Sequence, residues 1–220
     1  MIAVENGISR YYIIMRQMIT AFTSVWSLIR IWWREFTTFL VINIIWLILQ
    51  FFIITGPPAT ALLYSVARVA VDDDLIEFSA MWKSFKSLFI PAWKWGLMNL
   101  VVFGIIIINF YFYQDFPGFF WAVLRAAWGM LLILWTCVNL LYWPLWMLQE
   151  DLSVRTTLRN GFVLLLRKPA MVITMAGLSL VLVVVSVVTS LPLILFMMSW
   201  LAVFGTLIVD EALKDMPRTG

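Results

Sequence analysis

Long apolar stretches alternate along this chain with short polar or charged ones, and their lengths match the thickness of a membrane. Residues 36–55 hold no charged side chain, and twenty residues of helix measure about 30 Å, enough to cross the hydrocarbon of a bilayer. Residues 170–209 are almost uninterrupted in apolar character, about twice what one crossing needs, and should fold back at residues 190–192. The pattern predicts an all-α fold, with one integral membrane domain over residues 1–220 built as a polytopic transmembrane helical bundle.

Six crossings account for the apolar stretches. They are predicted at residues 36–55, 58–71, 93–113, 119–148, 170–190 and 192–209. The second, at residues 58–71, is short for a bilayer. Whether it crosses decides on which membrane face every later loop lies. If it crosses, fourteen of the fifteen Lys and Arg residues lie on one face, with Arg125 as the exception; if it turns back, the four N-terminal arginines join Arg125. The tendency of Lys and Arg to remain in the cytoplasm favours the first threading, with the N- and C-termini both cytoplasmic.

Three polar segments next to the spans have apolar residues at helical spacing. Residues 74–77 resemble a capping box that opens the second segment, and Ser153 is placed to cap the third. Each segment is predicted to be an amphipathic helix lying at the cytoplasmic interface. The first covers about residues 10–34, and its apolar stripe includes Met15, Met18, Phe22, Ile29 and Trp33.

Composition strengthens the membrane interpretation and narrows the partners. Hydrophobic residues make up 64% of the 220 positions and charged residues only 12%, so the lipid bilayer must solvate apolar surface that a core of this size cannot hide. The net charge of +3 comes from basic residues beside the spans, which favours contact with anionic headgroups and no nucleic acid. With one Cys and no His, we expect no zinc, haem or iron–sulfur site of the usual kind, and no cofactor.

Polar side chains inside the predicted spans are the candidates for chemistry. Catalysis needs titratable groups within hydrogen-bond reach, and no span combines two acids, or an acid with a base, away from its ends; we therefore predict no catalytic residue. Asn109 and Asn139 could line a solute path, although hydrogen bonding between helices is the commoner role. Arg125 lies six residues into the fourth span. It is either a functional intramembrane charge or a side chain that reaches back to the headgroups, close to Asp115.

Two loop motifs complete the pattern. Gly56, Pro57 and Pro58 are predicted to form the outer turn of the first hairpin, since Gly tolerates unusual backbone angles and Pro pre-sets the start of a helix. The three consecutive aspartates at residues 72–74 offer oxygen ligands for a divalent cation. Because consecutive side chains point in different directions, we interpret this run instead as a solvated approach to the next helix.

The stretch from Thr55 to Lys86 resembles a known family. It contains a Thr-Gly-Pro turn that runs into an Ala-Leu-Leu-Tyr segment, then the acidic run, then the aromatic and basic segment Trp-Lys-Ser-Phe-Lys at residues 82–86. These features resemble the YesL-like family of bacterial membrane proteins. The resemblance implies a multi-pass protein of the bacterial inner (cell) membrane without an established activity, often encoded beside sugar-uptake transporters. It supplies no catalytic residues.

Two hypotheses for function follow. The first is a non-enzymatic accessory or regulatory protein that assists carbohydrate uptake, with a sugar-transporter permease subunit as partner or with self-association. The alternative is a small oligomeric transporter or channel for a small solute. An intramembrane enzyme is disfavoured because paired acid and base groups are missing from the spans.

Overall fold

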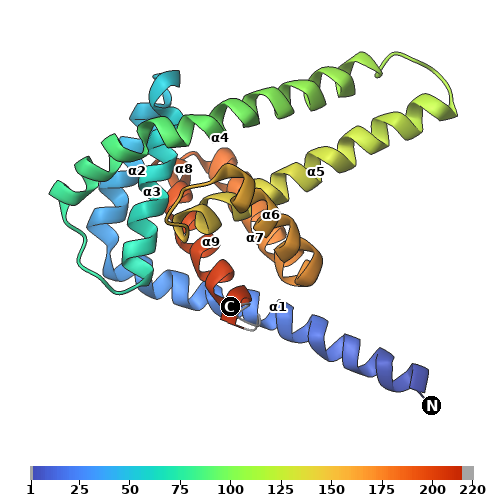
Figure 1. The fold of residues 1–220 in the computed structure, drawn as a ribbon, viewed down its shortest axis with the longest axis horizontal. Helices are drawn as coiled ribbons and strands as arrows, with labels where there is room; N and C mark the ends of the chain where they lie inside the picture. Colours follow the sequence, from blue (N-terminus) through green and yellow to red (C-terminus); the bar gives the residue numbers. More distant parts are fainter. Residues whose placement is uncertain (1, 215–220) are drawn as a thin grey trace.

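The computed structural model describes the backbone of residues 2–214 and the side chains of residues 12–214, and all regular secondary structure in that part of the chain is helical. The predicted all-α fold is thus confirmed. In chain order the helices are α1 (Ile2–Arg34), α2 (Phe36–Gln50), the short 3-10 helix η1 (Ile53–Thr55), α3 (Gly56–Val71), α4 (Phe78–Phe112), α5 (Phe119–Met147), α6 (Val154–Arg167), α7 (Pro169–Thr189), α8 (Leu191–Leu195) and α9 (Met197–Lys214) (Figure 1).

α1 is amphipathic, but its most apolar face is not the one that packs against the protein. In the stripe predicted from the sequence, Phe22 is 55% exposed and Trp33 is 72% exposed. The other face packs against α7 and α9. After Glu35 the chain bends by 91° into α2. The stripe is therefore left uncovered by protein along a helix that runs across the direction of α2. The buried face carries Gln17, Ala21, Ser24, Leu28 and Trp32.

α2 and α3 form a hairpin joined by η1. The chain reverses at residues 51–55, just before the predicted turn, and Gly56, Pro57 and Pro58 form the first turn of α3. The prolines do start the helix as predicted. The predicted role of Gly56 is wrong, because its backbone is right-handed helical with φ −58°. A Cβ at this position would instead approach Oε1 of Gln50 to 3.0 Å, so Gly56 provides space rather than an unusual backbone angle.

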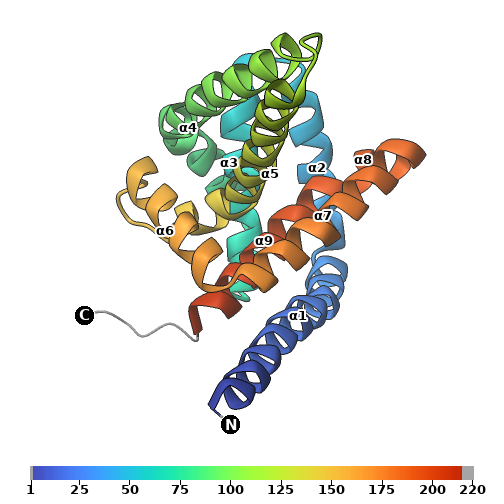
Figure 2. The ribbon, with the colours of Figure 1, turned by 90° about the vertical axis from the view of Figure 1, so that its right-hand side faces the viewer.

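α3 and α9 lie at the centre of the molecule (Figure 2). α3 packs against α2, α4, α5 and α9, and α9 also packs against α1 and α7. Two glycines permit the close approaches. A Cβ on Gly96 of α4 would lie 2.6 Å from Cγ of Pro57, and one on Gly205 of α9 would lie 3.0 Å from Cγ of Pro144. At each position a proline ring approaches the helix at a distance that a larger residue than glycine would prevent.

α4 differs most from the sequence-based expectation. An interfacial helix followed by a separate span at residues 93–113 was expected, whereas the structure has one continuous helix with Pro91 inside it. The predicted capping box would start the helix directly after Asp74, whereas the helix begins after Glu77, so the predicted capping box is wrong. The apolar pattern continues on both sides of Pro91, and a proline inside a helix can kink it without ending it.

One contact conflicts with the six-span threading. Nε1 of Trp93 donates a hydrogen bond of 2.7 Å to the carbonyl of Ile54, and Gly96 lies against Pro57. The threading put Ile54 at the outer edge of the bilayer and Trp93 at the inner edge, which are separated by about 30 Å of hydrocarbon. Residues in contact cannot occupy both edges, so the predicted register of the second and third crossings is wrong in this structure.

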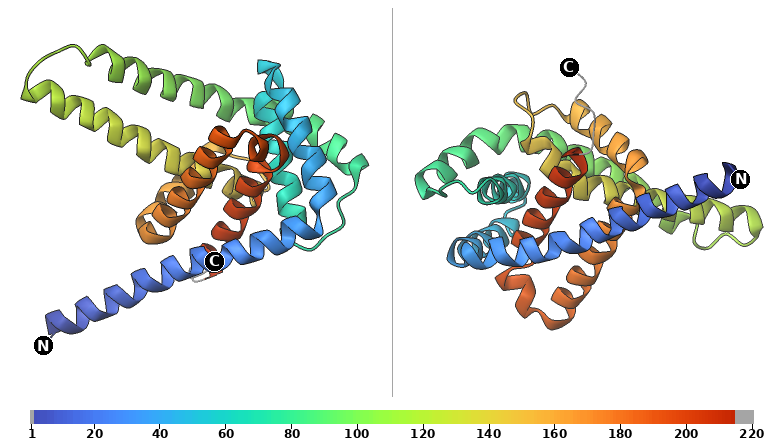
Figure 3. Two further views of the ribbon diagram at one scale, coloured as in Figure 1. Left: turned by 180° about the vertical axis from the view of Figure 1, so that it is seen from behind. Right: turned by 90° about the horizontal axis from the view of Figure 1, so that it is seen from below.

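Beyond its contact with α3, α4 leaves the body of the molecule and returns as α5, forming a hairpin that extends to one side (Figures 1 and 3). The two helices contact each other near the base of the hairpin and at its tip. Nε1 of Trp135 donates to Oδ1 of Asn99 over 2.8 Å, and the rings of Tyr113 and Trp121 stack with centroids 5.3 Å apart. The outward faces of this hairpin are apolar and exposed.

The C-terminal apolar stretch folds back where the sequence predicts. α7 ends at Thr189, and Ser190 takes a left-handed backbone conformation with φ 59°. A second break at Phe196 separates the short α8 from α9. The return path is therefore a broken helix rather than a simple hairpin.

Several helices are suited to a bilayer. In the described part of the chain, α4, α5 and α7 are each long and apolar enough to cross a membrane, and the bent pair of α1 and α2 would provide a fourth span if it counts as one. The chain is therefore a helical protein with three to four candidate spans by length and composition, fewer than the six that were predicted.

Candidate functional site

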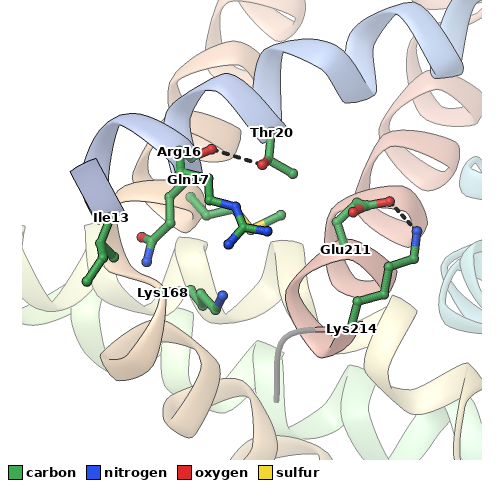
Figure 4. Close-up of a pocket in the computed structure, with 8 residues that line it drawn as sticks. Ile13, Arg16, Gln17, Thr20, Lys168, Glu211 and Lys214 are labelled. Carbon is green, nitrogen blue, oxygen red and sulfur yellow. Dashed lines mark hydrogen bonds and ion pairs between the residues drawn. The ribbon is translucent and has the colours of Figure 1, made fainter. Parts of the chain in front are cut away.

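A cavity lined by basic and other polar side chains lies among the described residues. It has a volume of about 550 Å³ and lies between α1, the start of α7 and the end of α9 (Figure 4). Its lining combines three cationic side chains with one carboxylate and one amide, over an apolar floor. The residues are Ile13, Arg16, Gln17, Thr20, Lys168, Met171, Glu211 and Lys214.

Each helix places its residue in the cavity for a local reason. On α1, Arg16, Gln17 and Thr20 lie within one turn, and Oγ1 of Thr20 donates to the carbonyl of Arg16 over 2.9 Å. Lys168 stands at the corner between α6 and α7, with φ −127° and ψ 50°. The following Pro169 forces that corner, because a residue before proline is driven out of the helical region and proline suits the first turn of the next helix.

Cationic side chains from three helices line the cavity. The Glu211 carboxylate accepts a hydrogen bond from Nζ of Lys214, and this hydrogen bond raises the pKa of Lys214, which therefore stays cationic. Arg16 and Lys168 add two further positive charges among the described lining residues. Gln17 is only 8% exposed, and its Oε1 is buried without a hydrogen-bond donor. A buried acceptor of this kind is costly unless a ligand or water supplies a donor.

Beside this cavity, a set of ion pairs joins the ends of α1, α3 and α9. Arg68 pairs with Asp72 on its own helix and, over 2.7 Å, with Asp210 of α9. Arg34 at the end of α1 pairs with Asp73 and donates a 2.7 Å hydrogen bond to the carbonyl of Ala70. The acidic run was interpreted as a solvated approach to a helix, but two of its three carboxylates pair with arginines. The carboxylate oxygens that bind these arginines are those that would have to bind a divalent cation at the acidic run.

Arg125 lies at the tip of the α4–α5 hairpin and binds backbone carbonyls. Its Nη1 donates to the carbonyl oxygens of Tyr113 at 2.8 Å, Phe116 at 3.0 Å and Gln114 at 3.3 Å. These oxygens belong to the end of α4 and the following turn, where carbonyls have no helical partner. Arg125 therefore closes the turn. This contact was not among the two alternatives drawn from the sequence.

The two candidate asparagines make bonds within their own helices. Nδ2 of Asn109 donates to the carbonyl of Ile105, and Nδ2 of Asn139 donates to that of Trp135, each four residues back. The structure does not bring Asn109, Asn139 and Arg125 into one site. Their position is explained by local backbone bonding of the kind that polar residues make inside apolar helices.

Asn43 has a structural role and was not among the candidate residues named from the sequence. It is fully buried in α2, and its Nδ2 donates to the carbonyls of Leu193 at 3.2 Å and Ile194 at 2.7 Å. Its Oδ1 accepts from the backbone N–H groups of Met198 at 3.1 Å and Ser199 at 3.2 Å. A single amide thus satisfies both sides of the break between α8 and α9. The only signal in the sequence is a lone polar residue in the middle of an apolar stretch.

The fold and this site define an α-helical protein with several helices long and apolar enough to cross a membrane. Residues 39–110, from α2 to the end of α4, match the model of a family described as "Protein of unknown function, DUF624". The match includes the stretch from Thr55 to Lys86 and is consistent with the YesL-like resemblance. No curated protein and no solved structure matches this chain.

Proposed function

We propose that this chain is a multi-pass protein of the bacterial inner membrane that acts as a non-enzymatic accessory component of a carbohydrate-uptake transporter. The observation that carries the proposal is the α4–α5 hairpin. It extends from the body with apolar side chains exposed on both helices (Figure 1). α4 and α5 contact each other and also contact the helices of the body. An exposed apolar hairpin is a surface on which another membrane protein can pack.

The polar groups of the hairpin favour the accessory function over the alternative of a small transporter or channel. Asn99 bonds to Trp135 across the hairpin, while Asn109 and Asn139 bond within their own helices. Arg125 is occupied by three carbonyls. A solute path needs polar groups directed into a common channel, and these four side chains are directed to separate places. The sugar-transporter partner itself rests on the YesL-like resemblance.

The basic cavity supports the orientation with both termini in the cytoplasm. It brings together Arg16 in the middle of α1, Lys168 at the start of α7 and Lys214 at the end of α9. Residues that line one cavity lie on the same side of a membrane, and a cluster of cations favours the cytoplasmic side. The pairing of Arg34 with Asp73 likewise supports a common side for the two ends of the α2–α3 hairpin.

The test is site-specific photocrosslinking in the native membrane. A photoreactive amino acid is introduced at Leu100 or Ile108 on α4, which are 69% and 68% exposed, with Leu180 on α7, 63% exposed, as the matched position outside the hairpin. We expect a covalent adduct with a permease subunit from the two α4 positions and lipid adducts alone from Leu180. Lipid adducts alone from the hairpin would contradict the proposal, and an adduct with twice the mass of the chain would indicate self-association instead.

A second experiment addresses the alternative function. The purified chain, reconstituted alone in liposomes, should pass no sugar or ion above a protein-free control. Flux from the purified chain, without a partner in the photocrosslinking experiment, would favour the small oligomeric transporter or channel.

A further inference from the structure

An apolar groove lies between α1, α7 and α9, separate from the basic cavity. These three helices pack against one another and run alongside each other in Figure 2. The groove has a volume of about 250 Å³, and none of the described residues that line it is charged. Aliphatic side chains from all three helices form most of its walls, and α9 adds the aromatic rings of Trp200 and Phe204.

Two polar atoms of residues that line this groove have no hydrogen-bond partner. Ser179 of α7 is only 4% exposed and its Oγ makes no hydrogen bond, and Nε1 of Trp200 on α9 is also buried without an acceptor. Other hydroxyls of α7 behave differently, because Thr174 and Thr189 each donate to a carbonyl four residues back. A buried donor without an acceptor is costly, so both atoms favour a ligand that brings an acceptor.

The position of the groove along α7 limits what can bring that acceptor. α7 is one of the helices long and apolar enough to cross a membrane, and Ser179 lies ten residues after Pro169, where the helix begins. In a crossing that starts at Pro169, ten residues of helix measure about 15 Å, half of the ~30 Å thickness of the hydrocarbon. The ester and phosphate groups of bilayer lipids lie at the membrane surface. The acceptor therefore belongs to a molecule that dissolves in the hydrocarbon itself.

The lining of the groove favours a flat ring. Trp200 and Phe204 supply aromatic rings against which another ring can stack. The Trp200 indole is held in place by ring contacts with Trp32 and Phe196, at centroid distances of 6.0 Å and 5.0 Å. A void of about 150 Å³ among apolar side chains is enough to hold benzene, and the groove is larger. A ring with oxygens on two edges can meet donors on two different helices.

We propose that this groove binds an apolar ring compound with carbonyl oxygens, of the chemical class of the membrane-soluble quinones. One carbonyl accepts from Oγ of Ser179 and another from Nε1 of Trp200, while the ring lies among the apolar side chains of the three helices. The Ser179 hydroxyl turns to its acceptor by a change of staggered χ1 rotamer. Binding uses no charged residue and requires no electron transfer, and it is independent of the accessory function proposed above.

The test measures how a matched pair of probes binds to the full chain in lipid nanodiscs. Duroquinone is a para-benzoquinone whose remaining ring positions all carry methyl groups, so it has no free position for reaction with Cys137. Durene has the same ring and methyl groups without the carbonyls. Equilibrium dialysis gives the amount of each probe retained beyond that in empty nanodiscs of the same lipid. We expect saturable retention of one duroquinone per chain, with durene bound at least about tenfold more weakly, the effect of two ordinary hydrogen bonds.

The chain offers a matched control for each donor. Ser179→Ala removes the hydroxyl at the groove, and Ser186→Ala removes a hydroxyl of the same helix that is also buried and unpartnered but does not line the groove. Trp200→Phe and Trp128→Phe form the corresponding pair, because Nε1 of Trp128 on α5 is likewise buried without a partner. Each groove variant should weaken duroquinone about fivefold and leave durene unchanged, and each control should leave both probes unchanged.

A third pair of variants locates the bound probe. Val185 lines the groove and is 47% exposed, whereas Val184 is 52% exposed and does not line it. Val185→Phe should reduce the retention of both probes, because the larger side chain occupies the groove, and Val184→Phe should reduce neither. Equal effects of these two substitutions would place the probes elsewhere on the chain and refute the site.

Two results with the unsubstituted chain would overturn the proposal without depending on how a variant folds. Retention of duroquinone no higher than in empty nanodiscs would mean that the acyl chains of the bilayer fill the groove. Equal affinity for duroquinone and durene would mean that the two donors take no part in binding. Among the variants, a loss of duroquinone that is the same in both groove variants and their controls would also refute the site. A selective loss in Ser179→Ala or in Trp200→Phe supports it.

Discussion

Replacing Asn43 with Leu should destabilise the protein more than replacing any other asparagine in its apolar helices. The side chain is fully buried and makes four hydrogen bonds, two to carbonyls near the end of α8 and two from N–H groups at the start of α9. Leu has a similar volume, so the loss is one of hydrogen bonds rather than of packing. The four backbone groups at the break would be left without these partners.

The size of the expected loss in unfolding free energy follows from the strength of hydrogen bonds between helices in a membrane. Hydrogen bonds between helices in a membrane contribute about 0.6 kcal/mol on average and at most about 1.7 kcal/mol each. Four of them give a loss of roughly 2–4 kcal/mol in the free energy of unfolding, since bonds that share one amide do not add fully. Asn139→Leu is the matched control. It removes one bond to a carbonyl of its own helix, and the expected cost is about 0.5 kcal/mol or less.

The assay is equilibrium unfolding of the purified chain in mixed micelles, followed by tryptophan fluorescence. Trp32 is one of the thirteen tryptophans that contribute to this signal, and its Nε1 donates to Oγ of Ser199, next to the break, over 3.1 Å. Asn43→Leu should shift the unfolding midpoint well below that of Asn139→Leu. Equal destabilisation by the two substitutions would refute the inference that Asn43 holds the break together.

Two further predictions concern the hairpin and the α3–α4 contact. Arg125→Met should lower the free energy of unfolding by about 1.5–3 kcal/mol, the range for hydrogen bonds to a charged group, whereas Arg125→Lys should retain most of it because an ammonium also has three donors. Limited proteolysis at residues 113–118 measures the loss, and a cost of Asp115→Asn equal to that of Arg125→Met would show that an ion pair across the turn matters instead. Gly96→Val should cost about 1–3 kcal/mol by overpacking against Pro57. Gly104→Val, in the same helix with open space around it, is the control, and equal unfolding midpoints of the two variants would contradict the close contact.

The features that the sequence predicts correctly are those set by neighbours within one turn. Ser153 caps α6 as expected, accepting a hydrogen bond from the backbone N–H of Thr156 over 3.3 Å. The prolines of α3 start their helix, and residues 190–192 mark the point where the C-terminal stretch folds back. In each case the steric or hydrogen-bonding preference of one residue acts on a backbone only a few positions away.

The features that could not be predicted depend on partners far along the chain. Nothing near Asn43 indicates that its amide would meet residues 193–199, some 150 positions later, and nothing near Arg125 distinguishes a carbonyl from a headgroup as its acceptor. The apolar pattern of α4 likewise predicts an apolar helix but not the helices that it contacts. It does not report that Trp93 would bond to Ile54, which is a matter of how two helices cross.

That crossing also explains why the predicted register of the second and third crossings does not fit this structure. A threading treats each apolar stretch as an independent helix parallel to the others, so it assigns a membrane face to every loop by parity. In this fold α4 begins along α3, passes the η1 turn at Gly96 and continues into the hairpin as one helix. Counting crossings no longer assigns a loop to a membrane face when a single helix packs first against α3 and then against α5. The charges then give a better guide to sidedness than the loop order, because Arg16, Lys168 and Lys214 gather in one cavity whichever helices cross the bilayer.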